Sequence, residues 1–330
     1  MVNILLVILI VLALGFAFMN GFNDSASVVA TIVASRAMTP RAALRIAAVA
    51  NFVGPFVFGV AVARTIGQDL AEREALTVPV IIAALGAATI WNLVTWRMGI
   101  PSSSSHALIG GLMGAVGVSA GVEALRLRGL WIVLTALFTS PLIGFVAGMI
   151  VIRLILWLAR GATPKINLFF KFAQVPTAII LSLSHGTNDA QKAMGMITLG
   201  LVVAGEQSGF AVPWWVIVAC AAAIGLGTAA GGWRIIRTLG GKFYRIRSVH
   251  SFASQLSSGL VILLVTLLGG PVSTTQVVSS AILGAGAGHR VSQVRWTVLN
   301  EIWIAWLLTL PVSAGLSALL YGLIYYFLGV

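Results

Sequence analysis

Two short stretches of the chain place a carboxylate beside an amide inside otherwise apolar sequence. The first reads Gly-Phe-Asn-Asp and ends at Asp24, and the second reads Gly-Thr-Asn-Asp and ends at Asp189. A carboxylate at membrane depth costs roughly 2.5 to 3.5 kcal/mol, so its default roles are cation ligand, proton carrier or ion-pair partner. Asn23 and Asn188 add carbonyl oxygens, which suit a hard cation such as Na+. We predict that these four residues bind Na+ or H+.

Two clusters of hydroxyl side chains each follow a proline. Proline in the first turn of a helix leaves the next backbone N–H groups free, and a helix start with hydroxyl donors can bind an oxyanion. Two such starts facing one another could hold a tetrahedral anion, although Ser and Thr also cap and pack membrane helices. The predicted anion-binding hydroxyls are Ser103, Ser104 and Ser105 in the first cluster and Ser273, Thr274 and Thr275 in the second.

Further polar residues in apolar segments are candidates to complete these sites. Asn51 and Gln191 are predicted to join the coordination shell of the anion, whereas Gln255 begins a segment and fits an interfacial role about as well. Glu301 has no acidic counterpart in the first half and is predicted to be structural.

Three ionisable residues flank the motifs and are weaker candidates. Lys192 lies at i+3 from Asp189, where an ion pair is the main expectation and contact with the anion the alternative. For His106 and His185 we expect an oriented hydrogen-bonding role, with a proton relay as the alternative because the pKa of histidine is near neutrality.

The elements that position these residues must lie in a membrane. The chain has 330 residues, of which 59% are hydrophobic and 8% charged, far below the charge content of a soluble domain. The net charge of +12 fits basic cytoplasmic loops better than a nucleic-acid footprint, so we expect no nucleic-acid partner. The single cysteine, Cys220, excludes an intramolecular disulfide. The apolar N-terminus lacks a basic leader and is predicted to be the first membrane helix rather than a cleaved signal.

The hydrophobic segments form two sets of five. They span about 3–35, 43–63, 77–97, 101–119 and 131–157, then about 172–204, 212–231, 249–269, 272–288 and 297–328. Such lengths predict an all-α integral membrane protein with about 10 to 12 transmembrane or re-entrant helices. The first segment of each set is too long for a straight crossing, and the Gly-x-Asn-Asp motif is the predicted place of a helix break.

The two sets also match in motif order. The Gly-x-Asn-Asp motifs are 165 residues apart, and the proline-hydroxyl motifs are 170 apart. We predict a first repeat at 1–157, a basic cytoplasmic linker at 158–171 and a second repeat at 172–330. With the N-terminus outside, as the basic residues indicate, the first repeat enters from outside and the second from inside, so the repeats are inverted; inverted repeats with broken helices are typical of secondary transporters.

The distribution of basic residues predicts the orientation. If both termini are extracytoplasmic, the outer loops hold only Arg64, Arg73, Arg126 and Arg128, and most other basic residues, including Arg234, Arg237 and Lys242, lie at cytoplasmic edges. Segments 77–97 and 101–119 could be two crossings or a re-entrant hairpin. We favour a hairpin with the serines at its tip, and the same arrangement for 249–269 and 272–288.

These stretches, "GFNDSASVVAT", "SHGTNDAQKAMG", "PSSSSH" and "PVSTTQ", resemble the signatures of the PiT family of inorganic phosphate transporters. The resemblance covers nearly the whole chain. It implies symport of phosphate with Na+ or H+ across a cell membrane, which in a bacterium is the inner membrane. It also implies that the transporter is a homodimer without an organic cofactor, and a cytoplasmic accessory regulator is a further expected partner. It also implies that Asn23, Asp24, Asn188 and Asp189 bind the coupling ion and that the hydroxyls of the two proline-hydroxyl clusters line the phosphate site.

Two departures from the family pattern leave alternatives open. Sodium-coupled animal members have glutamates where this chain has Asn51 and Gln255, and the second motif often ends in histidine where this chain has Gln276. The alternatives are a sulfate permease of the same family, a passive anion channel, and an intramembrane serine hydrolase that would use Ser105 with His106 or His185. The repeat argues against an enzyme, which needs only one nucleophile.

Overall fold

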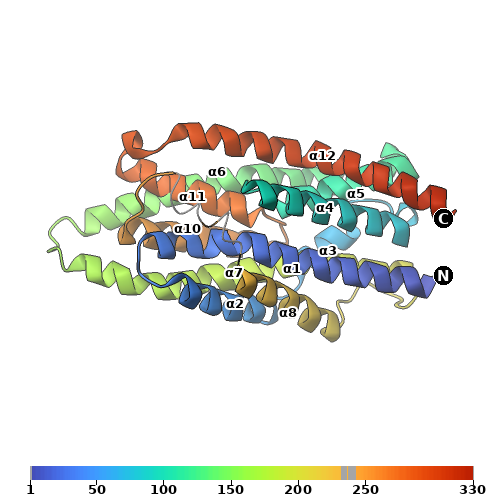
Figure 1. Ribbon diagram of the computed structural model, residues 1–330, viewed down its shortest axis with the longest axis horizontal. Helices are drawn as coiled ribbons and strands as arrows, with labels where there is room; N and C mark the ends of the chain where they lie inside the picture. The colour runs from blue at the N-terminus through green and yellow to red at the C-terminus, as the bar shows by residue number, and fades with distance from the viewer. Residues whose placement is uncertain (1, 232–235, 237–242, 330) are drawn as a thin grey trace.

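The computed structural model describes residues 2–231, 236 and 243–329, and the side chains among them except those of residues 2, 3 and 298–302. The predicted cytoplasmic residues Arg234, Arg237 and Lys242 and the side chain of Glu301 lie outside this part of the chain. The described residues form an elongated bundle of helices, with both termini at the same end (Figure 1).

The helices follow the predicted apolar segments closely. Six of them are long and apolar enough to cross a membrane, and a bent pair could supply a seventh. The prediction of an all-helical, multi-pass membrane protein is therefore confirmed for the described residues. The helices are α1 (Val2–Ala34), α2 (Pro40–Val57), α3 (Ala61–Gln68), α4 (Val78–Met98), α5 (Ser104–Ser119), α6 (Leu127–Leu158), α7 (Ile166–Val203), α8 (Trp214–Ala230), α10 (Ser248–Leu267), α11 (Thr274–His289) and α12 (Trp296–Leu328).

The two long helices that carry the Gly-x-Asn-Asp motifs, α1 and α7, run in opposite directions through the middle of the bundle (Figure 1). Both are continuous through the motif, so the break predicted there is wrong. The glycines instead allow close helix packing: a Cβ at Gly21 would overlap the carbonyl oxygen of Ile224 in α8, and one at Gly186 would overlap that of Asn51 in α2. The bend lies elsewhere, between α2 and α3, whose axes differ by 75°.

The proline-hydroxyl stretches form the tips of two helical hairpins, α4–α5 and α10–α11. At each tip a glycine with positive φ ends the first arm, Gly99 at 71° and Gly269 at 80°. A serine then starts the second arm, because Ser103 accepts from the backbone N–H of His106 and Ser273 from that of Gln276. The sequence therefore sets both the turn and the helix start at the same places in the two hairpins.

The hairpins enter from opposite ends of the bundle and their tips meet near its centre (Figure 1). The Ser105 hydroxyl of α5 donates to the carbonyl oxygen of Val272 at the other tip, at 2.7 Å. This geometry agrees with the re-entrant arrangement rather than with two full crossings.

Helices of the two halves interleave around the hairpins. The hairpin arm α5 packs on α12, and α11 packs on α6. Matching glycines allow both contacts, since a Cβ at Gly114 would overlap the Ala314 carbonyl oxygen and one at Gly284 that of Phe145. Each hairpin is thus supported by the last long helix of the opposite half.

Candidate functional site

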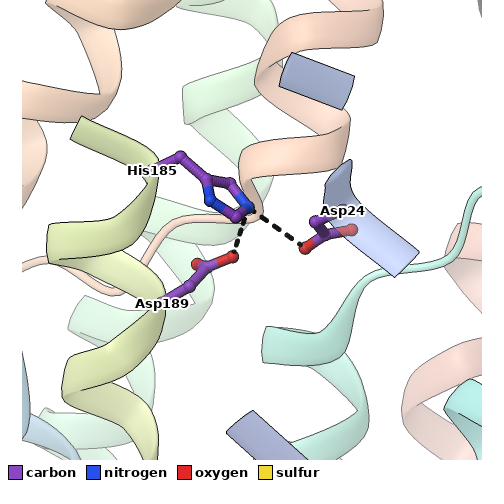
Figure 2. Close-up of side chains that lie close together, drawn as sticks. All are labelled: Asp24, His185 and Asp189. Carbon is purple, nitrogen blue, oxygen red and sulfur yellow. Dashed lines mark ion pairs between the residues drawn. The ribbon is translucent and has the colours of Figure 1, made fainter. Parts of the chain in front are cut away.

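Three ionisable side chains converge at the centre of the bundle (Figure 2). The His185 Nε2 atom lies 3.0 Å from Asp189 Oδ2, one turn along α7, and 3.8 Å from Asp24 Oδ2 on α1. All three side chains are buried, and one ligand atom of each lies within 4.8 Å of the other two. The two predicted carboxylates therefore share one site, as the repeated motif led us to expect.

The first turn of α11 supplies hydroxyl donors to both carboxylates. Thr274 Oγ1 lies 3.0 Å from Asp189 Oδ2 and 3.3 Å from Asp24 Oδ2, and Thr275 Oγ1 donates to Asp24 Oδ1 at 2.5 Å. The hydroxyl of Ser27 on α1 donates in turn to Thr275. The second proline-hydroxyl motif is thus in direct contact with both Gly-x-Asn-Asp motifs.

Asp189 carries most of the charge compensation in the cluster. Lys192 Nζ lies 2.5 Å from Asp189 Oδ1, and both side chains are completely buried. The Asn188 amide lies 2.7 Å from Thr266 Oγ1 on α10, which anchors this part of α7 to the second hairpin. The predicted ion pair between Lys192 and Asp189 is present.

Asn51 reaches the cluster through His185. Its Oδ1 lies 3.1 Å from His185 Nδ1, and its Nδ2 donates to Thr228 on α8 at 2.7 Å. Both ring nitrogens of His185 therefore face acceptors, Asn51 on one side and Asp189 on the other. Asn51 contacts the carboxylates through the imidazole rather than directly.

A small cavity of about 10 Å³ opens beside Asp24, between α1 and the first hairpin. Several polar atoms around it are buried and have no partner among the described residues: both amide atoms of Asn20, Oδ1 of Asn23 and Nδ2 of Asn92. Asn23 Nδ2 donates to the Asn92 carbonyl oxygen at 3.1 Å. Asn20 and Asn92 were not among the predicted site residues, although Asn20 directly precedes the first motif and Asn92 is a lone amide in an apolar segment. The lining is Asn20, Asn23, Asp24, Asn92, Pro101, Ser102, Ser104 and Thr275.

The serines of the first tip have different environments. Ser104 lines the cavity, Ser105 bonds to the other tip, and Ser103 lies 2.7 Å from His106 Nδ1. His106 Nε2 is buried and has no partner among the described residues, so no carboxylate orients this ring. The pair therefore lacks the third member that a serine hydrolase needs to orient its base.

Three of the predicted glutamines lie away from the carboxylates. Gln191 Oε1 accepts from the backbone N–H of Val62 at 2.8 Å and of Ala63 at 3.2 Å, so it caps α3. Gln255 Oε1 accepts from Thr177 on α7 at 2.8 Å, and Gln255 Nε2 donates to Thr31 on α1 at 3.1 Å, so this side chain is buried rather than interfacial. Gln276 is buried in the first turn of α11, where its backbone N–H bonds to Ser273.

Oppositely directed long helices, two hairpin tips and a buried ionisable cluster where they meet define a membrane transport protein rather than an enzyme. Comparison with known proteins agrees. The profile of the phosphate transporter family matches residues 20–165 and 159–317. The chain belongs to this family.

Relatives and a solved structure are similar over almost their whole length. A probable low-affinity inorganic phosphate transporter of Bacillus subtilis is 46% identical over 322 residues, covering 96% of each chain. One of Rhizobium meliloti is 44% identical over 319 residues, also covering 96% of each. A solved structure described as "The sodium-dependent phosphate transporter" is 27% identical, with a TM-score of 0.86 over 98% of this chain and 99% of the other.

Proposed function

We propose that this protein imports inorganic phosphate by symport with a cation, with Na+ favoured over H+. One observation carries the proposal: the hydroxyl-bearing start of α11 lies against a pair of buried carboxylates from two oppositely directed helices. An anion site and a cation site that share side chains make the occupancy of one depend on the other, which is what symport requires.

The hairpin tips supply the anion chemistry. The hydroxyls of Ser104, Thr274 and Thr275 face the cavity beside Asp24 or the two carboxylates, Ser105 bonds to the other tip, and Ser103 and Ser273 cap the first turns of α5 and α11. Thr274 and Thr275 donate to the carboxylates. A phosphate oxygen that accepted from these hydroxyls would replace those bonds, so phosphate binding requires the side chains to rearrange.

The cavity beside Asp24 fits a cation. Its oxygens come from a carboxylate, amide carbonyls and hydroxyls, the hard ligands that alkali and alkaline-earth ions prefer. A cavity of about 10 Å³ has room for one water-sized particle and none for a tetrahedral anion. Asn23 and Asp24 are therefore the proposed cation ligands, joined by Asn20, while Asn188 and Asp189 hold the opposite side of the site. The similar structure described as sodium-dependent supports Na+.

Uptake of labelled phosphate into proteoliposomes tests this proposal. A sodium gradient should drive accumulation, a proton gradient should drive less, and excess sulfate should compete weakly. Asp24→Asn should abolish accumulation and remain monodisperse in detergent, whereas Glu206→Gln, at an exposed carboxylate, should retain it. Uptake that needs neither gradient would point to a channel, and complete competition by sulfate would point to a sulfate permease.

Three broader expectations belong to the same proposal. The protein is placed in the cell membrane with both termini extracytoplasmic, and the shared end of the termini in Figure 1 supports a common side. The homodimer rests on family resemblance, because lipid contact accounts for the exposed apolar faces of α6 and α12 without a partner subunit. The cytoplasmic accessory regulator rests on family resemblance alone.

A further inference from the structure

One face of α1 carries a line of polar side chains that begins at the central site. Asp24, Ser27, Thr31 and Ser35 are spaced by three, four and four residues, so they lie along the same side of the helix and its C-terminal end. Asp24, Ser27 and Thr31 are buried, and Ser35 is half-buried just past the last turn. We call these four residues the α1 stripe.

Side chains of three other helices bond to the stripe along its length. Ser27 donates to Thr275 at 3.2 Å, and Thr31 accepts from Gln255 Nε2 at 3.1 Å. Ser35 donates to Gln174 Oε1 at 2.6 Å. These uncharged bonds close the space beside the stripe, and each can be exchanged for water or an anion when the helices separate.

The equivalent face of α7 is different. A shift of 165 residues pairs Ser27 with Lys192, Thr31 with Met196 and Ser35 with Gly200. Beyond Lys192 this face is apolar, and Gly200 packs against the side chain of Leu9. This face of α7 therefore has no counterpart of the α1 stripe, which runs from the central site toward the end of the molecule predicted to be cytoplasmic.

The stripe ends in a cavity of about 820 Å³ that is rich in arginine. Arg36 follows α1, Arg245 and Arg247 precede α10, and Arg295 precedes α12. All four are exposed, and among the described residues no carboxylate lines the cavity or pairs with them. The start of α10 also opens here without an acidic residue in its first turn.

The backbone at Arg36 adopts a conformation that glycine normally occupies. The N–H of Arg36 bonds to Val33 and that of Ala37 to Ile32, the pattern of a helix end that normally places glycine at the left-handed position. Arg36 has φ of 59° and is the one described non-glycine residue with positive φ. The matching end of α7 has the same bonds with Gly205 at that position. An arginine there strains the backbone, whereas the general preference for basic cytoplasmic loops would be met by an arginine at any unstrained loop position.

We propose that the arginine cavity is a second site for phosphate, which receives the anion from the central site along the α1 stripe on its way to the cytoplasm. This inference rests on the proposed transport function. Arginine side chains bind phosphate oxygens in pairs, and four at an exposed mouth bind weakly enough to let the anion leave. The shared chemistry is that of a phosphate group, so a lipid headgroup is the competing source.

Arg36→Gly separates backbone strain from anion binding. The variant should be at least as heat-stable as wild type, because glycine relieves the strain. Uptake is measured in phosphatidylcholine proteoliposomes that are sorted by the orientation of the protein through capture of a C-terminal tag. For phosphate entering through the cytoplasmic face, the half-saturating phosphate concentration of the variant should rise by about 3- to 10-fold. For phosphate entering through the opposite face, it should stay unchanged. Arg160→Gly, at an exposed loop arginine outside the cavity, is the matched control and should change neither.

The route itself is tested by cysteine accessibility in a Cys220→Ala background. Thr31→Cys should react with a membrane-impermeant thiol reagent from the cytoplasmic face and be protected by phosphate, and the repeat-equivalent Met196→Cys should not react from that face.

Several results would overturn the inference. One is that Arg36→Gly and wild type have equal half-saturating phosphate concentrations at both faces. Another is that the effect of Arg36→Gly appears only when anionic lipid is added, and a third is that Thr31→Cys does not react with the reagent. Absence of phosphate uptake by the wild type would instead refute the proposed function, so the two failures are distinguishable.

Discussion

The two central carboxylates should respond very differently to neutralisation. Asp189 lies 2.5 Å from Lys192 Nζ and 3.0 Å from His185 Nε2, whereas Asp24 has no lysine or arginine partner among the described residues and lies 3.8 Å from His185 Nε2. Asp189→Asn leaves the Lys192 ammonium completely buried and without its counter-charge. Removing one partner of a buried ion pair destabilises a protein by about 3 to 5 kcal/mol. Asp24→Asn removes a weakly compensated charge and should leave stability unchanged or raised.

Thermal unfolding in detergent, in buffer without sodium and phosphate, measures this difference without contributions from ligand binding. We expect Asp189→Asn to melt several degrees below wild type and Asp24→Asn to melt at or above it. The double variant Asp189→Asn with Lys192→Met should recover most of the loss, because replacing a whole buried pair by neutral side chains is close to neutral. The reasoning is refuted if both single variants melt alike, or if the methionine gives no recovery.

Three further substitutions test packing and site geometry. Gly284→Ala should lower stability by about 1 to 3 kcal/mol because its Cβ overlaps the Phe145 carbonyl, whereas Gly15→Ala, with open space around it, should not. The melting temperatures of the two variants, compared with that of wild type, test this expectation. Gln191→Ala should destabilise the protein by about 1 kcal/mol through the loss of the α3 cap, and it should leave the half-saturating phosphate concentration unchanged. A large rise in that concentration would instead place Gln191 in the phosphate site. Thr274→Val should reduce uptake at least about tenfold while Thr274→Ser retains it, and equal uptake by both would contradict a role for this hydroxyl.

The pairing of Asp24 with Asp189 could be predicted from the repeated motif. A polar group in an apolar segment needs a polar partner, and the matching motif in the oppositely directed segment is one of the few partners available at membrane depth. The contact of α11 with both carboxylates agrees with the family resemblance, which implies that the coupling ion binds next to phosphate. Gln191 shows the limit of such reasoning. Its partners are backbone groups of α3, more than a hundred residues away, and a polar residue in an apolar segment gives no sign of whether it faces a ligand or a helix end.

The helix break was mispredicted for a related reason. Glycine in a membrane helix permits either a distortion or the close approach of a neighbour, and sequence alone does not show which. The neighbour of Gly21 is Ile224, on a helix of the other half. Asn20 was missed because its role depends on a cavity that the first hairpin encloses.

The interleaving of the two halves has a consequence for biogenesis. While the first half emerges from the ribosome, neither α11 nor α12 exists, so α5 and α6 lack the surfaces on which they finally pack. The serine-bearing tip of the first hairpin would then face lipid or the insertion machinery until about residue 274 has been synthesised. The tip can take its place at the centre of the bundle only after the second hairpin has been made, so the first half must stay in the membrane without its final partners while much of the second half is synthesised.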